Sequence, residues 1–484
     1  VYKEMEEYNQ AISVYEKAIE LNPEYYEAYN NLGAALGKNE QYEEAEKILK
    51  HVIKLQPDFV EVLNNLGSIL TRIGKYDEAE AILSRSIKIN PNNAKVLSDL
   101  GDIYRKLNKY EQAVDYYKQA IKIKPNYYES LNSMGLALME LENYSKARNI
   151  FKQAIKLNPK KVQAYNNLGT IYHKVKNFNK AIMYYKKALK IDSDLAGVHQ
   201  NLGYVLSLIG DNKNSIQHLK LAILLEPDSK NYLHSLLFFL WYDFDLNPKD
   251  IFEYHKRYDQ RFGLPHKEKW KPFAQYKVLN KKLKIGYVSP DFRDHSMIRF
   301  LLPTLAHHNH EKFEIFAFAE LEKEDKVSQE YKKYVDHWIR TDGMSDDEVA
   351  QKIRDLGIDI LIDIGWHLKD SRLDVFSQKP APVSLTWWVA YGYTTGLSAI
   401  DYFLTDKFMA PKGSEHLFSE KLWRLDRYAA PWNPDRNNMG QVSNLPALSK
   451  GFITFGTLTR TIRINDRVIK AWADILTKVP NSKL

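Results

Sequence analysis

The sequence predicts an α-helical solenoid followed by an α/β lobe built on a parallel sheet. Over residues 1–230, glycine, proline, aromatic and alanine positions each recur every 34 residues, which indicates stacked helical hairpins. From Lys282 onward, short apolar runs alternate with helical stretches, which is typical of parallel strands joined by helices. A chain of 484 residues is long enough for two or three such folding units.

Each repeat register has a physical reason. Small residues lie where two helices of a hairpin cross, because only they let the axes approach closely. An aromatic residue fills the gap between hairpins, and proline ends the second helix since it lacks an N–H. The pattern resembles the tetratricopeptide repeat, with Asn212 and Ser215 breaking it in the last unit. The registers are Gly33, Gly67, Gly101, Gly135, Gly169 and Gly203; Pro23, Pro57, Pro91, Pro125 and Pro159, then Ser193 in the sixth place and Pro227 in the seventh; Tyr8, Tyr42, Tyr76, Tyr110, Tyr144 and Phe178; and Ala11, Ala45, Ala79, Ala113, Ala147 and Ala181.

A polar side chain stands two residues before each glycine, on the helix expected to line the concave face. A primary amide both donates and accepts, so a row of amides can bind the backbone of an extended peptide whatever its side chains. The alternative is that asparagine is simply tolerated on an exposed helix face. The predicted peptide-binding residues are Asn31, Asn65, Asn167 and Asn201, while Asp99 and Ser133 hold the same place in the middle repeats.

The second half predicts strands and helices in alternation, after a helical linker over residues 231–281. Carboxylates favour a helix N-terminus, which supports the helix that opens at Asp346. The expected strands are Leu283–Val288, Phe313–Phe318, Asp359–Ile364, Val383–Trp388, Tyr402–Thr405 and Leu422–Leu425, and the expected helices are Met297–His308, Asp346–Leu356 and Ser371–Ser377.

Polar loops follow three of these strands, where sites in open parallel sheets lie. They are Ser289–Met297, Gly365–His367 and Tyr391–Gly396. Two histidines, several hydroxyls and glycine-rich turns therefore meet at one edge of the sheet. Such an edge suits the handling of a hydroxyl and a phosphate, but composition alone does not name the reaction.

Several motifs carry a resemblance. Leu283-Lys-Ile-Gly-Tyr-Val-Ser-Pro-Asp-Phe292 with the nearby His295, Lys379-Pro-Ala-Pro-Val383, Thr394-Thr-Gly-Leu397 and Ala399-Ile-Asp-Tyr402 resemble the O-linked N-acetylglucosamine transferases, nearest to their SPINDLY-type branch. Ile453-Thr-Phe-Gly-Thr457 and Val479-Pro-Asn-Ser482 continue the match. That family also carries a tetratricopeptide array, so the resemblance covers nearly the whole chain.

The resemblance implies a GT-B architecture with two Rossmann-like lobes, of which residues 282–450 form the first and residues 451–484 begin the second. It implies transfer of a sugar, N-acetylglucosamine from UDP-GlcNAc, to Ser or Thr of proteins held by the repeats. GDP-fucose as donor is an open alternative, because some SPINDLY-type members use it. No metal or other cofactor is expected.

Site residues follow from the matched motifs. His295 and His367 match catalytic-site histidines, and Phe455, Gly456 and Thr457 match the donor lobe. The predicted substrate-binding residues are Asp291, Tyr391, Thr394, Thr395 and Gly396, with a structural turn as the alternative for the last three. For His295 the alternative is a loop histidine that caps the next helix.

The sequence also departs from the family pattern. The run from Trp387 to Gly392 is one residue longer than usual, Gly365-Trp-His-Leu368 moves a glycine and replaces a threonine, and Thr459 replaces an asparagine. A complete second lobe needs about 100–150 residues, so we expect residues 1–484 alone not to turn over. A peptide-binding scaffold with an incomplete transferase region is therefore the second hypothesis.

The amino-acid composition excludes several classes of protein and of site. With no cysteine, the chain forms no disulfide and offers no thiolate nucleophile or cysteine metal ligand. The chain has 69 Lys and Arg and 61 Asp and Glu, which gives a formal net charge of +8. This excess is spread along the chain, so it does not indicate a nucleic-acid partner. The longest apolar run, Leu236–Trp241, is too short to span a membrane. We expect a cytoplasmic protein; the sequence does not indicate its oligomeric state.

Overall fold

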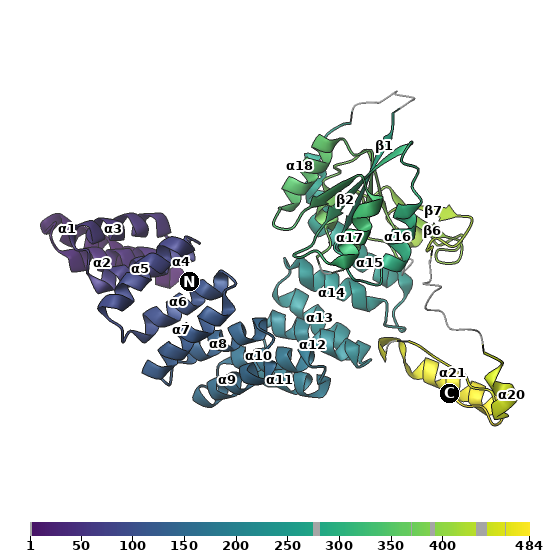
Figure 1. Ribbon diagram of the computed structural model, residues 1–484, viewed down its shortest axis with the longest axis horizontal. Coiled ribbons are helices and arrows are strands. Elements are labelled where there is room, and N and C mark those ends of the chain that lie inside the picture. The colour runs from purple at the N-terminus through teal and green to yellow at the C-terminus, as the bar shows by residue number, and fades with distance from the viewer. Residues whose placement is uncertain (1, 274–280, 369, 388–392, 432–442, 460) are drawn as a thin grey trace. The chain divides into compact units, whose positions relative to one another are not determined.

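The computed structural model describes residues 2–273, 281–368, 370–387, 393–431, 443–459 and 461–484 (Figure 1). The chain divides into two compact units, Val1–Asp194 and Leu195–Leu484. Each unit has its own hydrophobic core.

Unit 1 consists of helices that pack as successive hairpins, as the 34-residue period predicts. Glycine is required where the helices of one hairpin cross. A β-carbon at Gly135 would lie 2.5 Å from the Phe151 ring, and one at Gly169 would lie 2.4 Å from the Tyr185 ring. The helices are α1 (Tyr2–Leu21), α2 (Tyr26–Lys38), α3 (Tyr42–Leu55), α4 (Val60–Arg72), α5 (Tyr76–Ile89), α6 (Ala94–Lys106), α7 (Tyr110–Ile123), α8 (Tyr128–Glu140), α9 (Tyr144–Leu157), α10 (Val162–Lys174) and α11 (Phe178–Ile191).

Unit 2 opens with the last repeat hairpin, α12 (Ala196–Leu208) and α13 (Asn212–Leu225). This hairpin therefore lies in the same compact unit as the α/β lobe. The stretch expected as a helical linker forms α14 (Lys230–Leu240), α15 (Pro248–Tyr258), a π-helical turn η1 (Asp259–Gly263) and a 3₁₀ turn η2 (Leu264–Lys269). Both α14 and α15 pack into the core beneath the sheet.

The sheet has seven parallel strands in the order β3-β2-β1-β4-β5-β6-β7. The predicted solenoid followed by an α/β lobe is thus confirmed, and the predicted strand and helix ends that the structure describes agree to within two residues. The strands are β1 (Leu283–Ser289), β2 (Phe313–Ala319), β3 (His337–Arg340), β4 (Ile360–Asp363), β5 (Val383–Thr386), β6 (Tyr402–Asp406) and β7 (Lys421–Leu425). The helices and turns among them are α16 (Ile298–Ala306), α17 (Lys326–Tyr331), η3 (Lys332–Tyr334), α18 (Asp346–Leu356), α19 (Leu373–Ser377) and η4 (Glu415–Leu417).

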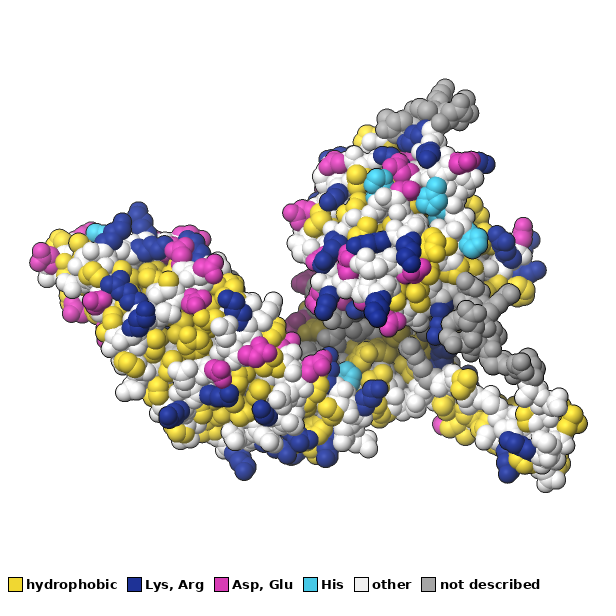
Figure 2. All heavy atoms as spheres, viewed as in Figure 1, with side chains coloured by type: hydrophobic (Ala, Val, Ile, Leu, Met, Phe, Trp, Pro, Cys, Tyr) yellow, Lys and Arg dark blue, Asp and Glu magenta, His cyan; other side chains and the backbone are white. Residues whose placement is uncertain are grey.

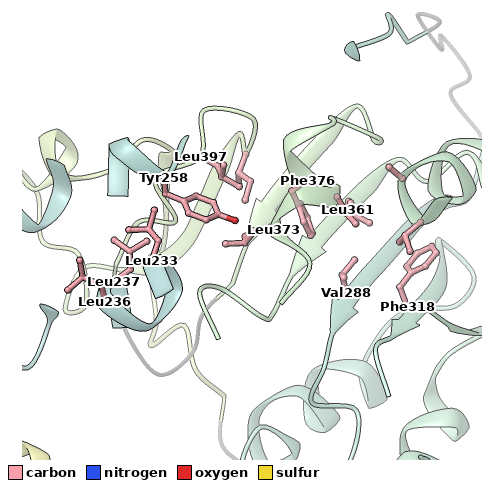
Figure 3. Close-up of a cluster of buried hydrophobic side chains, with 14 of the residues drawn as sticks. Leu233, Leu236, Leu237, Tyr258, Val288, Phe318, Leu361, Leu373, Phe376 and Leu397 are labelled. Carbon is pink, nitrogen blue, oxygen red and sulfur yellow. The ribbon is translucent and has the colours of Figure 1, made fainter. Parts of the chain in front are cut away.

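Alternate residues of the strands face two separate cores. Val288, Phe318 and Leu361 point to the core that α14, α15, α18 and α19 cover, and Figure 3 shows these side chains together with Leu233 and Tyr258. Intervening strand residues face the second core, under α16 and α17. A sheet covered on both faces leaves its strand ends as the place for a site.

The C-terminal segment contains α20 (Pro446–Lys450), the 3₁₀ turn η6 (Thr461–Arg463) and α21 (Asp466–Lys478), and Thr454 forms a parallel bridge with Lys483. Its turn η6 docks on the last repeat. The Asn212 amide donates to the carbonyl oxygens of Tyr242 at 3.1 Å and Ile462 at 3.0 Å. An aromatic ring could not make these bonds, which explains why the repeat pattern breaks at Asn212.

Charged side chains of both signs are interspersed on the face of each unit that Figure 2 shows. Within the described residues, no helix combines the length and the apolar character needed to cross a bilayer.

Candidate active site

The carboxyl ends of β1 and β4 form the switch point of the sheet, because the chain moves outward from β1 to β2 and β3 and then returns to β4. A crevice beyond this point is the usual ligand site of a doubly wound sheet. The loops that leave the two strands touch, since a β-carbon at Gly365 would lie 3.4 Å from the Pro290 ring.

Asp363, the last residue of β4, fixes the loop that follows. Its buried carboxylate accepts bonds from the backbone N–H groups of Gly365, at 2.9 Å, and Trp366, at 3.2 Å, and from the Thr386 hydroxyl at 2.8 Å. Burial raises the pKa of Asp363 to about 6, partly offset by these three bonds. The loop turns through a positive φ of 45° at Trp366, which brings His367 inward.

His367 is buried and held at both ring nitrogens. Its Nε2 lies 2.7 Å from the Thr395 carbonyl oxygen, which can only accept, so Nε2 carries the hydrogen. Its Nδ1 lies 3.2 Å from Nδ1 of His234, which must then be the donor. Burial lowers the pKa of His367 well below its ordinary value of 6.5. His367 therefore positions the loop as a neutral ring, and its catalytic role stays a prediction.

His255 completes a group of three histidines. Its ring centroid lies 5.2 Å from that of His367, and its Nε2 accepts a bond from Nε1 of Trp241 at 3.2 Å. His255 is wholly inaccessible to solvent, and burial lowers its pKa to about 3. Within the described residues, no group of three or more metal-ligand side chains is arranged to hold a metal ion.

Both threonines of the loop before β6 donate hydrogen bonds to one buried carboxylate, that of Glu420. Glu420 accepts the Thr394 hydroxyl at 2.6 Å, the Thr395 backbone N–H at 2.8 Å and the Thr395 hydroxyl. Burial raises the pKa of Glu420. Gly396 has a φ of 85°, and a β-carbon there would lie 2.4 Å from the His255 carbonyl oxygen. The loop thus packs against the histidine group, and its predicted contact with substrate stays a prediction.

His295 lies on the opposite loop of the switch point and is part-exposed. Its Nδ1 lies 3.3 Å from Oδ2 of the buried Asp291. Burial raises the pKa of Asp291, the neighbouring His295 and Arg293 lower it, and Asp370 on the loop after β4 raises it.

A cavity of about 660 Å³ opens beside this edge, and we call it the α12–α14 cavity. Its walls are aromatic, with polar groups between them, a combination typical of ligand sites. It places Asn201, the last of the predicted amides, in one cavity with His367. Its lining consists of Gln200, Asn201 and Tyr204 from α12; Ser229, Asn231, Tyr232, His234, Ser235, Phe238 and Phe239 from α14 and the residue before it; and His367, Leu368 and Asp370 from the loop after β4.

The remaining predicted residues lie elsewhere. In unit 1, Asn65 donates to Asn30 at 2.8 Å and Asn167 donates to Asn132 at 3.1 Å, so amides of neighbouring repeats are paired, while Asn31 is exposed. Each paired amide keeps a second N–H for a ligand. Phe455, Gly456 and Thr457 lie in the C-terminal segment, where the Phe455 N–H donates to the Lys483 carbonyl; Tyr391 lies outside the described residues.

Sequence reasoning missed His234, His255, Tyr258 and Glu420. Two of them could have been found, because His255 and Tyr258 share the face of α15 that also carries the buried Ile251. Glu420 gave no signal, since it lies outside every motif and far along the chain from the threonines it binds.

The buried histidines predict an acid-sensitive unit 2. The unfolded chain takes up a proton at His255 below pH 6.5, whereas the folded state stays neutral until about pH 3. The stabilisation from neutral His255 is therefore complete above pH 6.5 and is lost as pH falls. Relative to His255→Gln, the wild type should lose about 1.4 kcal/mol more unfolding free energy per pH unit between pH 6 and 4. Urea unfolding followed by tryptophan fluorescence measures this, because every tryptophan lies at or after Trp241; parallel pH profiles would contradict it.

The fold and this edge define a class: a tetratricopeptide-repeat protein that carries a doubly wound α/β lobe with a polar site at its switch point. Residues 225–429 match the family profile described as Glycosyl transferase family 41. Residues 196–229 match a tetratricopeptide repeat, and residues 1–202 match the profile of the cilia and flagella-associated protein 70 C-terminal domain. Residues 225–429 are therefore similar to glycosyl transferase family 41, and the hairpin before them is similar to a tetratricopeptide repeat.

Individual proteins agree with this assignment. The chain is 32% identical over 265 residues to a protein of Solanum lycopersicum named "Probable UDP-N-acetylglucosamine--peptide N-acetylglucosaminyltransferase SPINDLY", covering 54% of this chain and 28% of that protein. The protein of that name from Arabidopsis thaliana is 32% identical over 263 residues, with the same coverage. The solved structure of a mutant O-GlcNAc transferase from Thermobaculum terrenum superposes with a TM-score of 0.64 and 28% identity, over 73% of this chain and 67% of that one.

These matches confirm the resemblance that the motifs indicate. The chain spans 28% of the length of the two plant proteins.

Proposed function

We propose that this chain contributes acceptor binding and the first catalytic lobe to a protein O-glycosyltransferase. The α12–α14 cavity carries the proposal, because it brings the last repeat amide, Asn201, to the switch-point loop that holds His367 and Asp370. A peptide segment bound at Asn201 would lie in the same cavity as His367, at the sheet edge. The names of the plant relatives support UDP-GlcNAc as donor, and the name of the Thermobaculum terrenum enzyme supports GlcNAc as the sugar. GDP-fucose is the alternative.

The proposed reaction is a displacement at the anomeric carbon of the donor. The Ser or Thr oxygen forms a bond to that carbon, the bond from carbon to the diphosphate breaks, and the hydroxyl proton passes to a base. His295 is our candidate for orienting the acceptor or taking that proton, because it is part-exposed at the switch point and its Nδ1 lies 3.3 Å from Oδ2 of Asp291. We expect no metal cofactor. A cytoplasmic location also stays a prediction.

A transfer assay tests this function. The natural full-length protein would be incubated with a Ser/Thr peptide library and radiolabelled UDP-GlcNAc or GDP-fucose. We expect label on Ser or Thr from UDP-GlcNAc, and less label with His295→Ala because acceptor orientation is lost. Peptide binding without label from either donor would favour the scaffold hypothesis, and equal labelling by His295→Ala would remove His295 from the site.

A further inference from the structure

We propose that a second cavity, between α13, α14 and α15, binds a short acidic segment of a partner protein that carries one or two large apolar side chains. We call it the α13–α15 cavity; it has a volume of about 630 Å³. The proposal does not rest on sugar transfer.

The floor of this cavity is apolar. Leu233 and Leu236 of α14 form it, together with Ile223 of α13, and all three belong to or pack against the core beneath the sheet. Leu224 stands at the lip and is 72% exposed, which is unusual for leucine on a well-packed helix. A leucine or phenylalanine side chain of a ligand would find its contacts here.

The rim is basic. Lys220, Arg257 and Arg261 line the cavity, and no acidic residue does, among the residues that the structure describes. Arg261 is paired with Asp228, but Lys220 and Arg257 converge on one ring: Nζ of Lys220 lies 5.2 Å, and Cζ of Arg257 5.0 Å, from the Tyr254 centroid. Two cations drawn to one ring with no carboxylate between them form a natural anion site.

Charge complementarity therefore selects the occupant. Apolar contacts under a basic rim fit an acidic segment with large apolar residues, and the groove between helices suits a peptide laid along it. A bilayer surface fits less well, because the apolar floor is recessed below the rim rather than protruding.

The cavity is independent of the candidate active site. Leu233 and Leu236 project from one side of α14, whereas His234, Ser235 and Phe238 project about 180° away, at 100° per residue, into the α12–α14 cavity. A partner bound here would leave the acceptor cavity open. It would tether the protein to a complex without competing with an acceptor peptide.

A displayed library of random 12-residue peptides tests the proposal. It would be selected on the 484-residue chain and then depleted on the Lys220→Glu/Arg257→Glu variant. We expect enriched peptides with Asp or Glu beside Leu, Ile or Phe. Their binding, measured by fluorescence anisotropy, should weaken about ten-fold or more in that variant and also with rising salt.

Matched controls keep the result specific. Lys152→Glu/Lys156→Glu makes the same charge change on exposed residues of α9 and should leave binding unchanged. Leu224→Ala should weaken it, while Leu55→Ala, at another exposed leucine, should not. Enrichment of peptides without acidic residues, or equal loss in both charge variants, would overturn the proposal. So would binding to phosphatidylserine vesicles that depends on Lys220 and Arg257 when no peptide is enriched.

Discussion

Gly396→Ala should lower the unfolding free energy of unit 2 by about 2 to 5 kcal/mol. The left-handed backbone at Gly396 costs an alanine about 1–2 kcal/mol. The added β-carbon would also lie 2.4 Å from the carbonyl oxygen and 2.6 Å from the carbonyl carbon of His255, so α15 must shift, which costs about 1–3 kcal/mol more. Urea unfolding followed by tryptophan fluorescence reports on unit 2, because unit 1 contains no tryptophan.

Gly343→Ala is the matched control. Gly343 has a similar φ of 79°, but a β-carbon there would meet nothing within 4 Å. This variant should therefore lose only the backbone cost of about 1–2 kcal/mol. Equal losses in the two variants would mean that the contact between the threonine loop and α15 does not hold the histidine group.

The repeat array could be predicted because four kinds of residue recur along the sequence with the same 34-residue period. Gly135 and Ala147 mark the same helix crossing that the structure shows, and each is small for one local reason. Signals of this kind depend only on nearby residues, so they can be recognised without knowledge of the rest of the fold. Most strands of the lobe could be predicted as well, because buried parallel strands are continuous apolar runs in the sequence.

Elements without such signals were missed. β3, which covers His337–Arg340, is a short half-exposed edge strand, so it presents no apolar run. α17 is short, and its start is a capping box at Asp325 and Ser328, which marks a helix only when an apolar pattern follows.

The location of the candidate site could be predicted from the sequence, but the contacts among its buried residues could not. Parallel strands bring His295 and His367 to one edge, and the motif positions indicate both. The burial of His367, by contrast, depends on α14 and α15, which contribute His234 and His255. The sequence predicts that region only as a helical linker. Contacts between segments more than 100 residues apart, such as His234 with His367, have no counterpart in local sequence.

Filling the α12–α14 cavity should lower the proposed sugar transfer strongly. Ser235 lines the cavity, is partly exposed and accepts a bond from Nε2 of Gln200 at 3.1 Å. In Ser235→Trp the indole would occupy the space left for the acceptor chain, so acceptor binding and transfer should fall about a hundred-fold. Lys249→Trp adds the same ring at an exposed position of α15, away from the cavity, and should behave like the wild type.

Mass spectrometry of an acceptor peptide after incubation with the natural full-length protein and UDP-GlcNAc tests the central claim most directly. We predict N-acetylglucosamine on Ser or Thr with the wild type and Lys249→Trp, and about a hundred-fold less with a Ser235→Trp variant that melts like the wild type. Equal modification of the peptide by Ser235→Trp would show that acceptors reach the sugar by another path and would contradict the account.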